Sequence, residues 1–402
     1  MNIVVAQSGG PTAVINASLL GVFREAMASG EVETVFGALH GVEGLLNDDL
    51  VSLNDQLETP EDMALLRQTP SSVLGSCRYK MPAPEEDTAP YEKINRTLEA
   101  HGIGGVFLIG GNDSMDTVAK LARYFASVDS PVRVMGVPKT VDNDLVGTDH
   151  TPGFGSAAKY IATTVAETIR DCTVYDLDSV TILEIMGRDT GWLTAAAALP
   201  HLCGEKAPHL VYLPETPFSV DNFVEDVKAL LKEERTVIVA VSEGVEVASL
   251  ADYQSGAVDN FGHKYLAGVG KCLADIVKEK IGCKVRSIEL NTPQRSAAHC
   301  VSLTDREEAE QAGEAAVKAA LEGKTGMMTV FHRVGPNPYQ MSVSVTSVQT
   351  VANAVKYVPG KWINKRGNNV SYDLLAYIRP LIMGETKLIT KNGIPAYFKL
   401  KK

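Results

Sequence analysis

Residues 105–114 read GVFLIGGNDS, and residues 132–144 read VRVMGVPKTVDND. Both stretches begin with a short apolar run and end in a break made of glycine or polar side chains. The N-terminal residues 2–6, NIVVA, lead into the turn SGGPT (8–12) in the same way. Apolar runs of this length are typical of buried parallel strands, and the residues that follow the first turn predict a helix over 13–28. The repeated unit is a strand, a polar turn and a helix, which predicts an α/β fold.

The same alternation continues through the rest of the chain. Further apolar runs, which predict strands, lie at 180–185, 210–213, 236–241 and 285–290. Helical patterns lie at 154–170 and 220–234. We therefore expect two doubly wound α/β/α lobes, the first ending near residue 153 and the second beginning near residue 154. Because ligands bind outside the carboxyl ends of parallel strands, we expect the polar turns to converge on one cleft.

The composition excludes some classes of function. The chain has 402 residues, of which 45% are hydrophobic and 22% charged, which suits a globular protein of two domains. Its 38 Lys and Arg residues against 49 Asp and Glu residues give a net charge of −11. Nucleic-acid binding depends on a basic face, so we expect no nucleic-acid partner. An anionic ligand must then be held by a local basic pocket.

The cysteines and the N-terminal residues bear on the compartment. Six cysteines are scattered along the chain without a CxxC pair, which indicates neither a zinc site nor a disulfide framework. The opening MNIVVAQSGG lacks the basic and apolar regions of a signal peptide, and no run of about 18 apolar residues occurs. We expect a cytoplasmic protein with reduced thiols and no membrane partner.

Two of the polar turns have the character of anion-binding loops. SGGPT (8–12) and GGNDS (110–114) follow strands and precede helices, where glycines let backbone N–H groups approach a phosphate. Neither turn is a Walker A loop or a GxGxxG motif. An ordinary turn between a strand and a helix is the alternative for each of them.

The segment PKTVDND (138–144) is the richest in chemistry. It places a cation, a hydroxyl and two carboxylates just after an apolar strand, and Asp142 and Asp144 point the same way if the loop is extended. One carboxylate can take a proton from a substrate hydroxyl while the other helps to hold Mg²⁺. A solvated turn is the alternative, because Asp and Asn are common in turns.

Arginine and glutamate side chains accompany the later strands. Arg188 and Glu243 each follow an apolar run. Arg286 lies within the next run, and Arg295 comes shortly after it. Arginine pairs with phosphate through two parallel hydrogen bonds, and a glutamate suits sugar hydroxyls. Together these residues indicate a phosphorylated sugar, although a structural ion pair is the alternative for each one alone.

Six ordered motifs resemble the phosphofructokinase family, from residue 3 to about residue 330. They are SGGPTAVINA, LGSCR (74–78), GGNDS, PKTVDND, EIMGR (184–188) and TPQRS (292–296). In that family, members that use ATP carry glycine at the positions of Asp113 and Lys139, so this sequence resembles the pyrophosphate-dependent branch. The closing segment 370–381 is similar to the tail of that branch. A carboxylate at Asp113 would repel the α-phosphate of ATP, and Lys139 is a point charge suited to pyrophosphate.

The resemblance implies a reversible, Mg²⁺-dependent transfer of a phosphoryl group from pyrophosphate to the C1 hydroxyl of fructose 6-phosphate. The products would be fructose 1,6-bisphosphate and phosphate. One lobe, 1–153 with 296–356 returning to it, would hold pyrophosphate and Mg²⁺. The other lobe, 154–295 with 357–402 packing on it, would hold the sugar phosphate. A homodimer or homotetramer is also implied, because some sugar-phosphate ligands in the family come from a neighbouring subunit.

The same resemblance assigns roles to individual residues. Asp142 would be the general base, with Asp113 and Lys139 as further catalytic residues. Pyrophosphate would be bound by Gly10, Arg78, Asp113 and Lys139. The sugar phosphate would be bound by Thr140, Val141, Asp142, Met186, Gly187, Arg188, Glu243, Arg286, Thr292, Pro293, Gln294 and Arg295. Magnesium would be bound by Asn112 and Asp144.

A few positions depart from the family pattern. Asn112 stands where the family commonly has a metal-binding acid, and Ser179 stands where many relatives have an arginine. Thr292 replaces a histidine or tyrosine. The smaller set of sugar-phosphate ligands leaves room for a longer acceptor such as sedoheptulose 7-phosphate.

Three alternative functions fit the sequence less well than this one. An ATP-dependent 6-phosphofructokinase is opposed by Asp113 and Lys139. A non-catalytic regulatory subunit of a phosphofructokinase should have lost the base, yet Asp142 and Asp144 are both present. A nicotinamide-dependent dehydrogenase would need a GxGxxG turn after the first strand, which SGGPTA does not fit.

Overall fold

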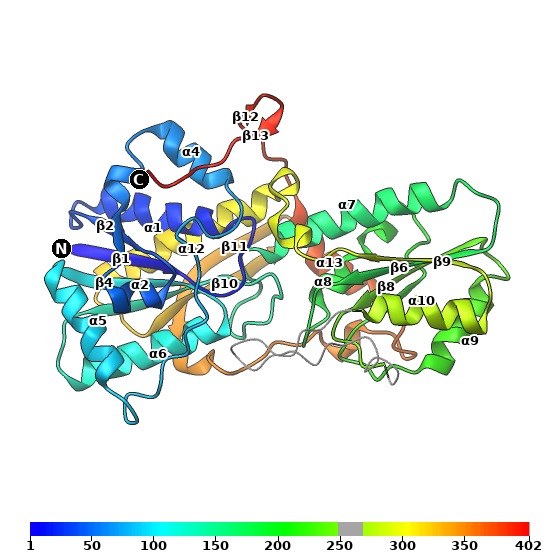
Figure 1. Ribbon diagram of the computed structural model, residues 1–402, viewed down its shortest axis with the longest axis horizontal. Helices are drawn as coiled ribbons and strands as arrows, with labels where there is room; N and C mark the ends of the chain where they lie inside the picture. The colour runs from blue at the N-terminus through cyan, green and yellow to red at the C-terminus, as the bar shows by residue number, and fades with distance from the viewer. Residues whose placement is uncertain (248–267, 402) are drawn as a thin grey trace.

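Two sheets, one in each half of the molecule, organise the fold (Figure 1). The computed structural model describes residues 1–247 and 268–401. Over these residues, a seven-stranded sheet with its helices forms the first lobe, and a four-stranded sheet with its helices forms the second lobe. This confirms the expected α/β class. No helix in the described part of the chain has both the length and the hydropathy needed to cross a membrane.

The first lobe is built on a mostly parallel sheet. Its strands are β1 (Asn2–Gln7), β2 (Val35–Ala38), β3 (Leu50–Ser52), β4 (Ile103–Gly110), β5 (Arg133–Pro138), β10 (Met327–Pro336) and β11 (Tyr339–Ser347). Their order is β11-β10-β5-β4-β1-β2-β3, with β3 and β11 antiparallel to their neighbours at the two edges. Residues 327–347 therefore complete a sheet that residues 2–138 begin.

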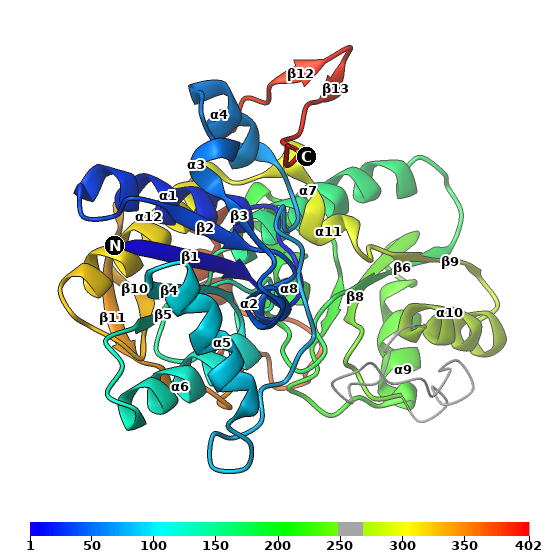
Figure 2. The same ribbon diagram turned by 60° about the vertical axis from the view of Figure 1, so that its left-hand side comes forward.

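Helices cover both faces of this sheet (Figures 1 and 2). Packed on one face are α1 (Ile15–Ser29), α3 (Leu53–Gln56), α4 (Pro60–Gln68) and α12 (Leu303–Leu321). Packed on the other are α2 (Val42–Asn47), α5 (Ala89–Ala100) and α6 (Asn112–Ser127). The long helices α1 and α12 can approach closely because Gly21 and Gly313 lie at their contact. A Cβ on Gly21 would lie only 2.1 Å from the carbonyl oxygen of Glu310.

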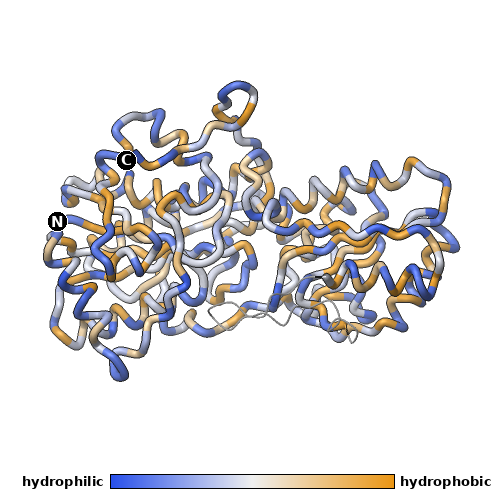
Figure 3. Tube along the Cα trace, viewed as in Figure 1, coloured by the Kyte–Doolittle hydropathy of each residue, from blue (hydrophilic) through white to orange (hydrophobic). Residues whose placement is uncertain are grey.

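The second lobe is built on a fully parallel sheet. Its strands are β6 (Ser179–Ile185), β7 (Leu210–Tyr212), β8 (Thr236–Ser242) and β9 (Lys284–Glu289), in the order β7-β8-β6-β9. One face packs against α7 (Phe154–Cys172), α8 (Trp192–Ala196) and α13 (Tyr372–Ile378). The other face packs against α9 (Val220–Leu230) and α10 (Val269–Lys280), and α11 (Pro293–Ser296) follows β9. Strands β6, β7 and β8 read as apolar runs because helices bury both of their faces, and Figure 3 shows such runs within each lobe. The edge strand β9 is partly exposed.

The segment after β11 packs against both lobes. Leu374 of α13 lies in the core of the second lobe, but Phe398 lies in the core beside α1 of the first lobe. Gln68 of α4 also donates from Nε2 to the carbonyl of Ile389 at 2.9 Å. The expectation that residues 357–402 pack on the second lobe is therefore wrong for their last part, which buries its apolar side chain on the first lobe. That part contains β12 (Thr390–Lys391) and β13 (Ile394–Pro395).

A buried imidazole lies on the segment that leads from β5 into α7. His150 is 1% exposed, and its ring nitrogens lie 2.9 Å from Asp149 Oδ1 and 2.7 Å from Glu308 Oε2. Arg333 pairs with Asp149 at 2.9 Å, and the Tyr339 hydroxyl donates to Glu308 Oε1 at 2.6 Å. Burial opposes the imidazolium, but the two carboxylates outweigh it and raise the pKa of His150 above its ordinary value of 6.5.

Replacing His150 by phenylalanine is expected to lower the free energy of unfolding by about 3 kcal/mol near pH 6, because the buried carboxylate of Glu308 and the half-buried carboxylate of Asp149 lose a shared cation. The stabilisation by the imidazolium is complete below the unfolded-state pKa and is lost as the pH rises through the higher folded-state pKa. Urea unfolding should therefore show a smaller difference between wild type and variant in alkaline buffer. An equal difference in both buffers would contradict a charged His150.

Candidate active site

Three strand ends of the first lobe meet at one edge of its sheet. The N–H of Ser8, just after β1, donates to the carbonyl of Ile109 in β4 at 2.9 Å. The N–H of Lys139, just after β5, donates to the carbonyl of Gly110 at 3.0 Å. The turns SGGPT, GGNDS and PKTVDND therefore lie side by side, as the sequence predicts for parallel strands.

A buried lysine lies at the centre of this edge. The Lys139 side chain is 2% exposed, and its ammonium donates to the carbonyl of Gly10 at 2.6 Å. Burial lowers the pKa of Lys139 to about 8, although the charges of Asp142 and Asp144 act in the opposite direction. Lys139 is therefore a cation at neutral pH that water screens little.

The two glycines of SGGPT keep a space open beside this cation. Gly9 has a φ of +74°, a left-handed conformation that favours glycine. A Cβ on Gly9 would lie 3.4 Å from Nζ of Lys139, and a Cβ on Gly10 would lie 3.2 Å from Nη1 of Arg295. A side chain at either position would fill the space between a lysine and an arginine, where an anion is favoured.

The surroundings of Asp142 disfavour its charged form. Burial raises the pKa of Asp142 above its ordinary value of 3.8, and the negative charges of Asp144 and Glu243 raise it further. The cations Lys139 and Arg188 oppose this shift. A carboxylate with a raised pKa is a stronger base, which general base catalysis near neutral pH requires.

Asp144 offers an oxygen that other protein groups leave free. Its Oδ1 is buried without a hydrogen-bond partner in the described part of the chain, and burial raises the pKa of Asp144. An unsatisfied carboxylate oxygen fits a hard cation such as Mg²⁺. Within residues 1–247 and 268–401, no group of three or more His, Cys, Asp or Glu side chains could hold a metal by itself. Mg²⁺ commonly needs only one or two carboxylates, together with water and substrate phosphates.

The carboxyl ends of β6 and β8 form the facing part of the site. The N–H of Gly187, with a φ of +143°, donates to Glu243 Oε1 at 3.3 Å. The N–H of Met186 donates to Gln294 Oε1 at 3.3 Å, which joins α11 to the end of β6. A small hollow opens beside these groups. It is lined by Glu184, Ile185, Met186, Glu243, Glu289, Asn291 and Gln294.

Charged groups of both lobes influence one another across this space. Burial raises the pKa of Glu243 to about 6, while the cations Arg188 and Arg295 oppose the shift. Burial lowers the pKa of Arg295, and Asp142 and Glu243 oppose that shift. Nε of Arg188 is buried without a hydrogen-bond partner among the described residues. The arrangement of two guanidinium groups and two carboxylates suits a ligand with both phosphate and hydroxyl groups.

The family model described as Phosphofructokinase matches residues 2–320 of the chain. The chain belongs to the phosphofructokinase family. Similar relatives are pyrophosphate--fructose 6-phosphate 1-phosphotransferases from Xanthomonas campestris pv. campestris, 40% identical over 406 residues, and Rhodospirillum rubrum, 41% identical over 410 residues. The first alignment covers 100% of this chain and 96% of the relative, and the second covers 99% and 96%.

A solved structure gives the same result for the fold of this phosphofructokinase-family chain. The crystal structure of pyrophosphate-dependent phosphofructokinase from Nitrosospira multiformis superimposes with a TM-score of 0.88 at 35% sequence identity. The match covers 100% of this chain and 96% of that chain. The family resemblance and the architecture predicted from the sequence are thus confirmed.

The remaining family-derived residues occupy the rim and the floor of the site. Asp113 is exposed in the first turn of α6, and Arg78 is exposed on the loop that follows Leu74. Val141 is buried beside Asp142. Four residues of this group adjoin the strand ends of one lobe or the other: Thr140 after β5, and Thr292, Pro293 and Gln294 at the start of α11.

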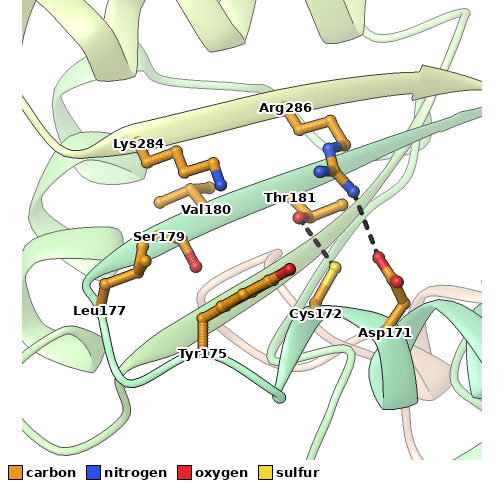
Figure 4. Close-up of a pocket in the computed structure, with 9 residues that line it drawn as sticks. All are labelled: Asp171, Cys172, Tyr175, Leu177, Ser179, Val180, Thr181, Lys284 and Arg286. Atoms are coloured by element: carbon orange, nitrogen blue, oxygen red, sulfur yellow. Dashed lines mark hydrogen bonds and ion pairs between the residues drawn. The ribbon is translucent and has the colours of Figure 1, made fainter.

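Arg286 lies apart from the other predicted sugar-phosphate ligands. It is in the middle of β9, about 10 Å before the end of the strand at Glu289. Figure 4 shows its guanidinium directed toward Asp171 of α7, at 3.3 Å, near Thr181 of the neighbouring strand β6. Within one chain, Arg286 therefore does not join Arg295. The expectation that Arg286 and Arg295 hold one sugar phosphate therefore remains a prediction, which requires Arg286 to come from a neighbouring subunit.

Asn112 has a structural use that its place in the family motif does not reveal. Its Nδ2 donates to the carbonyl of Ala354 at 2.7 Å, and its Oδ1 accepts from the N–H of Asn353 at 3.0 Å. The amide thus holds the backbone that follows β11. Because both ends of this amide already make hydrogen bonds, Asn112 is a less suitable metal ligand than Asp144.

Two buried amides that the sequence analysis missed support the site from behind. Gln7 Nε2 donates to Asn16 Oδ1 at 2.8 Å, and Asn16 Nδ2 donates to the carbonyls of Thr69 and Ser71 at 2.8 and 2.7 Å. Gln7 Oε1 accepts from the N–H of Leu74 at 3.1 Å. These bonds fix the loop before Arg78 against α1. The sequence offers one local indication of this buried network, which is the polar residue Gln7 at the end of an apolar strand.

Proposed function

We propose that this protein transfers a phosphoryl group reversibly from pyrophosphate to the C1 hydroxyl of fructose 6-phosphate, in a Mg²⁺-dependent reaction. The observation that carries the proposal is Lys139, a buried cation beside the Gly9-Gly10 space and the base Asp142. Members of the family that use ATP have glycine where this lysine lies. The names of the two relatives described above support the same donor and acceptor.

Asp113 supports pyrophosphate over ATP as the donor. It lies in the first turn of α6, one residue after the helix begins at Asn112, and a carboxylate there is compatible with the positive end of the helix dipole. A nucleotide would have to bring its α-phosphate past this charge. Repulsion between this carboxylate and the α-phosphate would reject ATP. Pyrophosphate has only two phosphoryl groups and would not have to pass the carboxylate.

The second lobe supports a sugar phosphate as the acceptor. Glu243 can accept hydrogen bonds from sugar hydroxyls, and its carboxylate is held by the N–H of Gly187. Arg188 and Arg295 present guanidinium groups to the same space. A sugar bound there would face Asp142 across the cleft between the lobes.

The residues account for the transfer step. Asp142 accepts the proton of the C1 hydroxyl while the sugar oxygen forms a bond to the terminal phosphorus of pyrophosphate. The bridging P–O bond breaks, and its electron pair stays on the departing phosphate. Lys139 and the backbone of the SGGPT turn stabilise the charge on that phosphate. In the reverse direction, protonated Asp142 returns the proton to the leaving sugar oxygen.

Asp144 is the residue that would hold Mg²⁺ in this proposal. Its unsatisfied Oδ1 is the oxygen available for a hard cation. When bound, Mg²⁺ supplies charge neutralisation for the pyrophosphate oxygens. The proposal rests on Asp144 and not on Asn112, whose amide is engaged with Asn353 and Ala354.

Phosphorus NMR of the purified protein tests the reaction in both directions. With pyrophosphate, fructose 6-phosphate and Mg²⁺, equal amounts of fructose 1,6-bisphosphate and phosphate should form. With the two products supplied, pyrophosphate should appear. The absence of either signal with Mg²⁺ present, or full rates in excess chelator, would contradict the proposal. The same assay with sedoheptulose 7-phosphate as the acceptor tests the size of the sugar site. Phosphorylation of this longer sugar would indicate a wide site, and turnover of fructose 6-phosphate alone would indicate a narrow one.

We further propose that the enzyme is a homo-oligomer, a dimer or tetramer, in which Arg286 reaches the sugar phosphate of a neighbouring subunit. Arg286→Ala should raise the KM for fructose 6-phosphate by about 10- to 100-fold, the effect of losing a charged hydrogen bond. Oligomers that combine Arg286→Ala subunits with Asp142→Asn subunits should regain sites of low KM, because an intact Asp142 then meets an intact Arg286. A uniformly high KM in these mixed oligomers would contradict the shared site.

A further inference from the structure

A lysine far along the chain contacts the loop that carries the two catalytic carboxylates. Lys356 follows β11, and its ammonium donates to Asn143 Oδ1 at 3.1 Å, to the carbonyl of Thr148 at 3.2 Å and to the carbonyl of Asp149 at 2.9 Å. An ammonium has three donors, so these contacts use all of them. Lys356 therefore has no hydrogen left to give to a substrate and cannot serve as a second Lys139.

The backbone of Lys356 is also tied to both lobes. Its N–H donates to the carbonyl of Asp144 at 2.7 Å, and its carbonyl accepts from Nε1 of Trp192 in α8 at 2.8 Å. The ammonium lies 5.4 Å from the centre of the Trp192 ring, within the range of a cation–π contact. The residue is thus fixed in space independently of its bond to Asn143.

Asn143 is the residue between Asp142 and Asp144, and it has an unusual conformation. Its φ is +53°, in the left-handed region, and its side chain is fully buried. Asn enters this region more readily than most residues, but the conformation still needs support from its surroundings. The side chain is held at both ends, because its Nδ2 donates to the Tyr377 hydroxyl at 3.1 Å and its Oδ1 accepts from Lys356.

We propose that Lys356 is a positioning residue for phosphoryl transfer, which holds Asn143 in the left-handed turn that aims Asp142 and Asp144 into the cleft. This role rests on the proposed function, in which Asp142 is the base and Asp144 the metal ligand. A reversal of the chain at Asn143 sets the direction of both neighbouring side chains. Release of the amide would let the turn relax and move the base from the C1 hydroxyl without changing the sugar site on the second lobe.

The variant Lys356→Met tests this role, because methionine has similar length and no donor. We expect kcat to fall by about 100-fold, the effect of misplacing a catalytic group by about 1 Å. The KM for fructose 6-phosphate should stay close to the wild-type value, because Arg188 and Glu243 are untouched. Lys361→Met, at an exposed lysine five positions away, is the matched control and should keep the wild-type kcat.

A double-mutant cycle shows whether Lys356 acts through Asn143. If it does, the variant carrying both Lys356→Met and Asn143→Ala should be no slower than the slower single variant. Losses that multiply, or a wild-type kcat in Lys356→Met, would overturn the proposal. If Lys356→Met does not fold, Tyr377→Phe removes a single oxygen at the other end of Asn143. It should lower kcat with little change in KM, and a wild-type kcat would overturn the proposal.

Amide hydrogen exchange tests the positioning role of Lys356 independently of the proposed reaction. In the protein without substrates, Lys356→Met should increase amide exchange in a peptide covering residues 138–149 and leave the strands of the second lobe protected as in wild type. This result is expected whether or not the wild-type protein turns over pyrophosphate. Unchanged exchange in 138–149 would overturn the positioning role, whereas absent turnover in the wild type would overturn only the reaction.

Discussion

Replacing Asp142 by asparagine is expected to lower kcat by about 1,000-fold, within the range that a general base contributes. Asparagine keeps the size of the side chain and the hydrogen bond from the backbone N–H to the Thr140 hydroxyl at 3.1 Å. It cannot accept the proton of the C1 hydroxyl. The KM for fructose 6-phosphate should change little, because the sugar is held mainly by the second lobe. Initial-rate kinetics with saturating pyrophosphate and Mg²⁺ measure both constants.

Asp129→Asn is the matched control for this experiment. Asp129 is exposed, lies after α6 away from the site, and has a φ of +51° that asparagine adopts readily. It should keep the wild-type kcat. A variant Asp142→Asn with more than a tenth of the wild-type kcat would show that the proton leaves by another route, and would remove the assignment of Asp142 as the base.

The second large effect concerns the choice of phosphoryl donor. The double variant Asp113→Gly with Lys139→Gly is expected to lose about 100- to 1,000-fold in kcat/KM for pyrophosphate, because a preorganised cation beside the departing phosphate is removed. The same change removes the carboxylate that repels the α-phosphate of ATP. Measurable transfer from ATP should therefore appear. Rates with each donor, at fixed fructose 6-phosphate and Mg²⁺, give the preference directly.

The single variants separate the two effects. Asp113→Gly should admit ATP while keeping much of the pyrophosphate activity, because Asp113 is exposed and Lys139 is still present. Lys139→Gly should lose pyrophosphate activity and leave a cavity where the side chain was buried. An unchanged donor preference in the double variant would show that neither position selects the donor.

The sequence predicts those parts of the site in which neighbours along the chain remain neighbours in space. The segment PKTVDND could be interpreted because its polar residues directly follow an apolar strand, and the carboxyl ends of β1, β4 and β5 meet at one edge. Strands β1, β4, β5, β6, β7 and β8 were predictable because helices bury both of their faces and they read as apolar runs. Strands β2, β3, β10 and β11 were not predicted, and the alternating exposure of β11 shows one reason. The choice of donor came from Asp113 and Lys139, two residue types set in recognisable motifs.

Other parts depend on contacts between distant residues, which no local pattern reveals. Arg286 looked like a partner of Arg295, but the pleat and direction of β9 place it beside Asp171. Phe398 packs on the first lobe because an apolar side chain near the end of the chain finds the core beside α1. Asn112 contacts the backbone more than 240 positions away, as its bond to Ala354 shows.

Lys356 is the strongest example of such a contact. It lies 213 positions from Asn143 in the sequence, and nothing in its neighbourhood resembles a motif. Only the folded chain shows that its ammonium meets an amide and two carbonyls of the loop that carries the base. Residues that position a catalytic group in this way escape motif analysis, because their own chemistry does not touch the substrate.

The central claim is that pyrophosphate, and not ATP, is the phosphoryl donor. The most direct measurement gives purified protein fructose 6-phosphate and Mg²⁺ with either pyrophosphate or ATP as the only donor, and follows fructose 1,6-bisphosphate. Formation of the bisphosphate with pyrophosphate, and none with ATP, is the predicted result. Formation with ATP alone would contradict the roles given to Asp113 and Lys139.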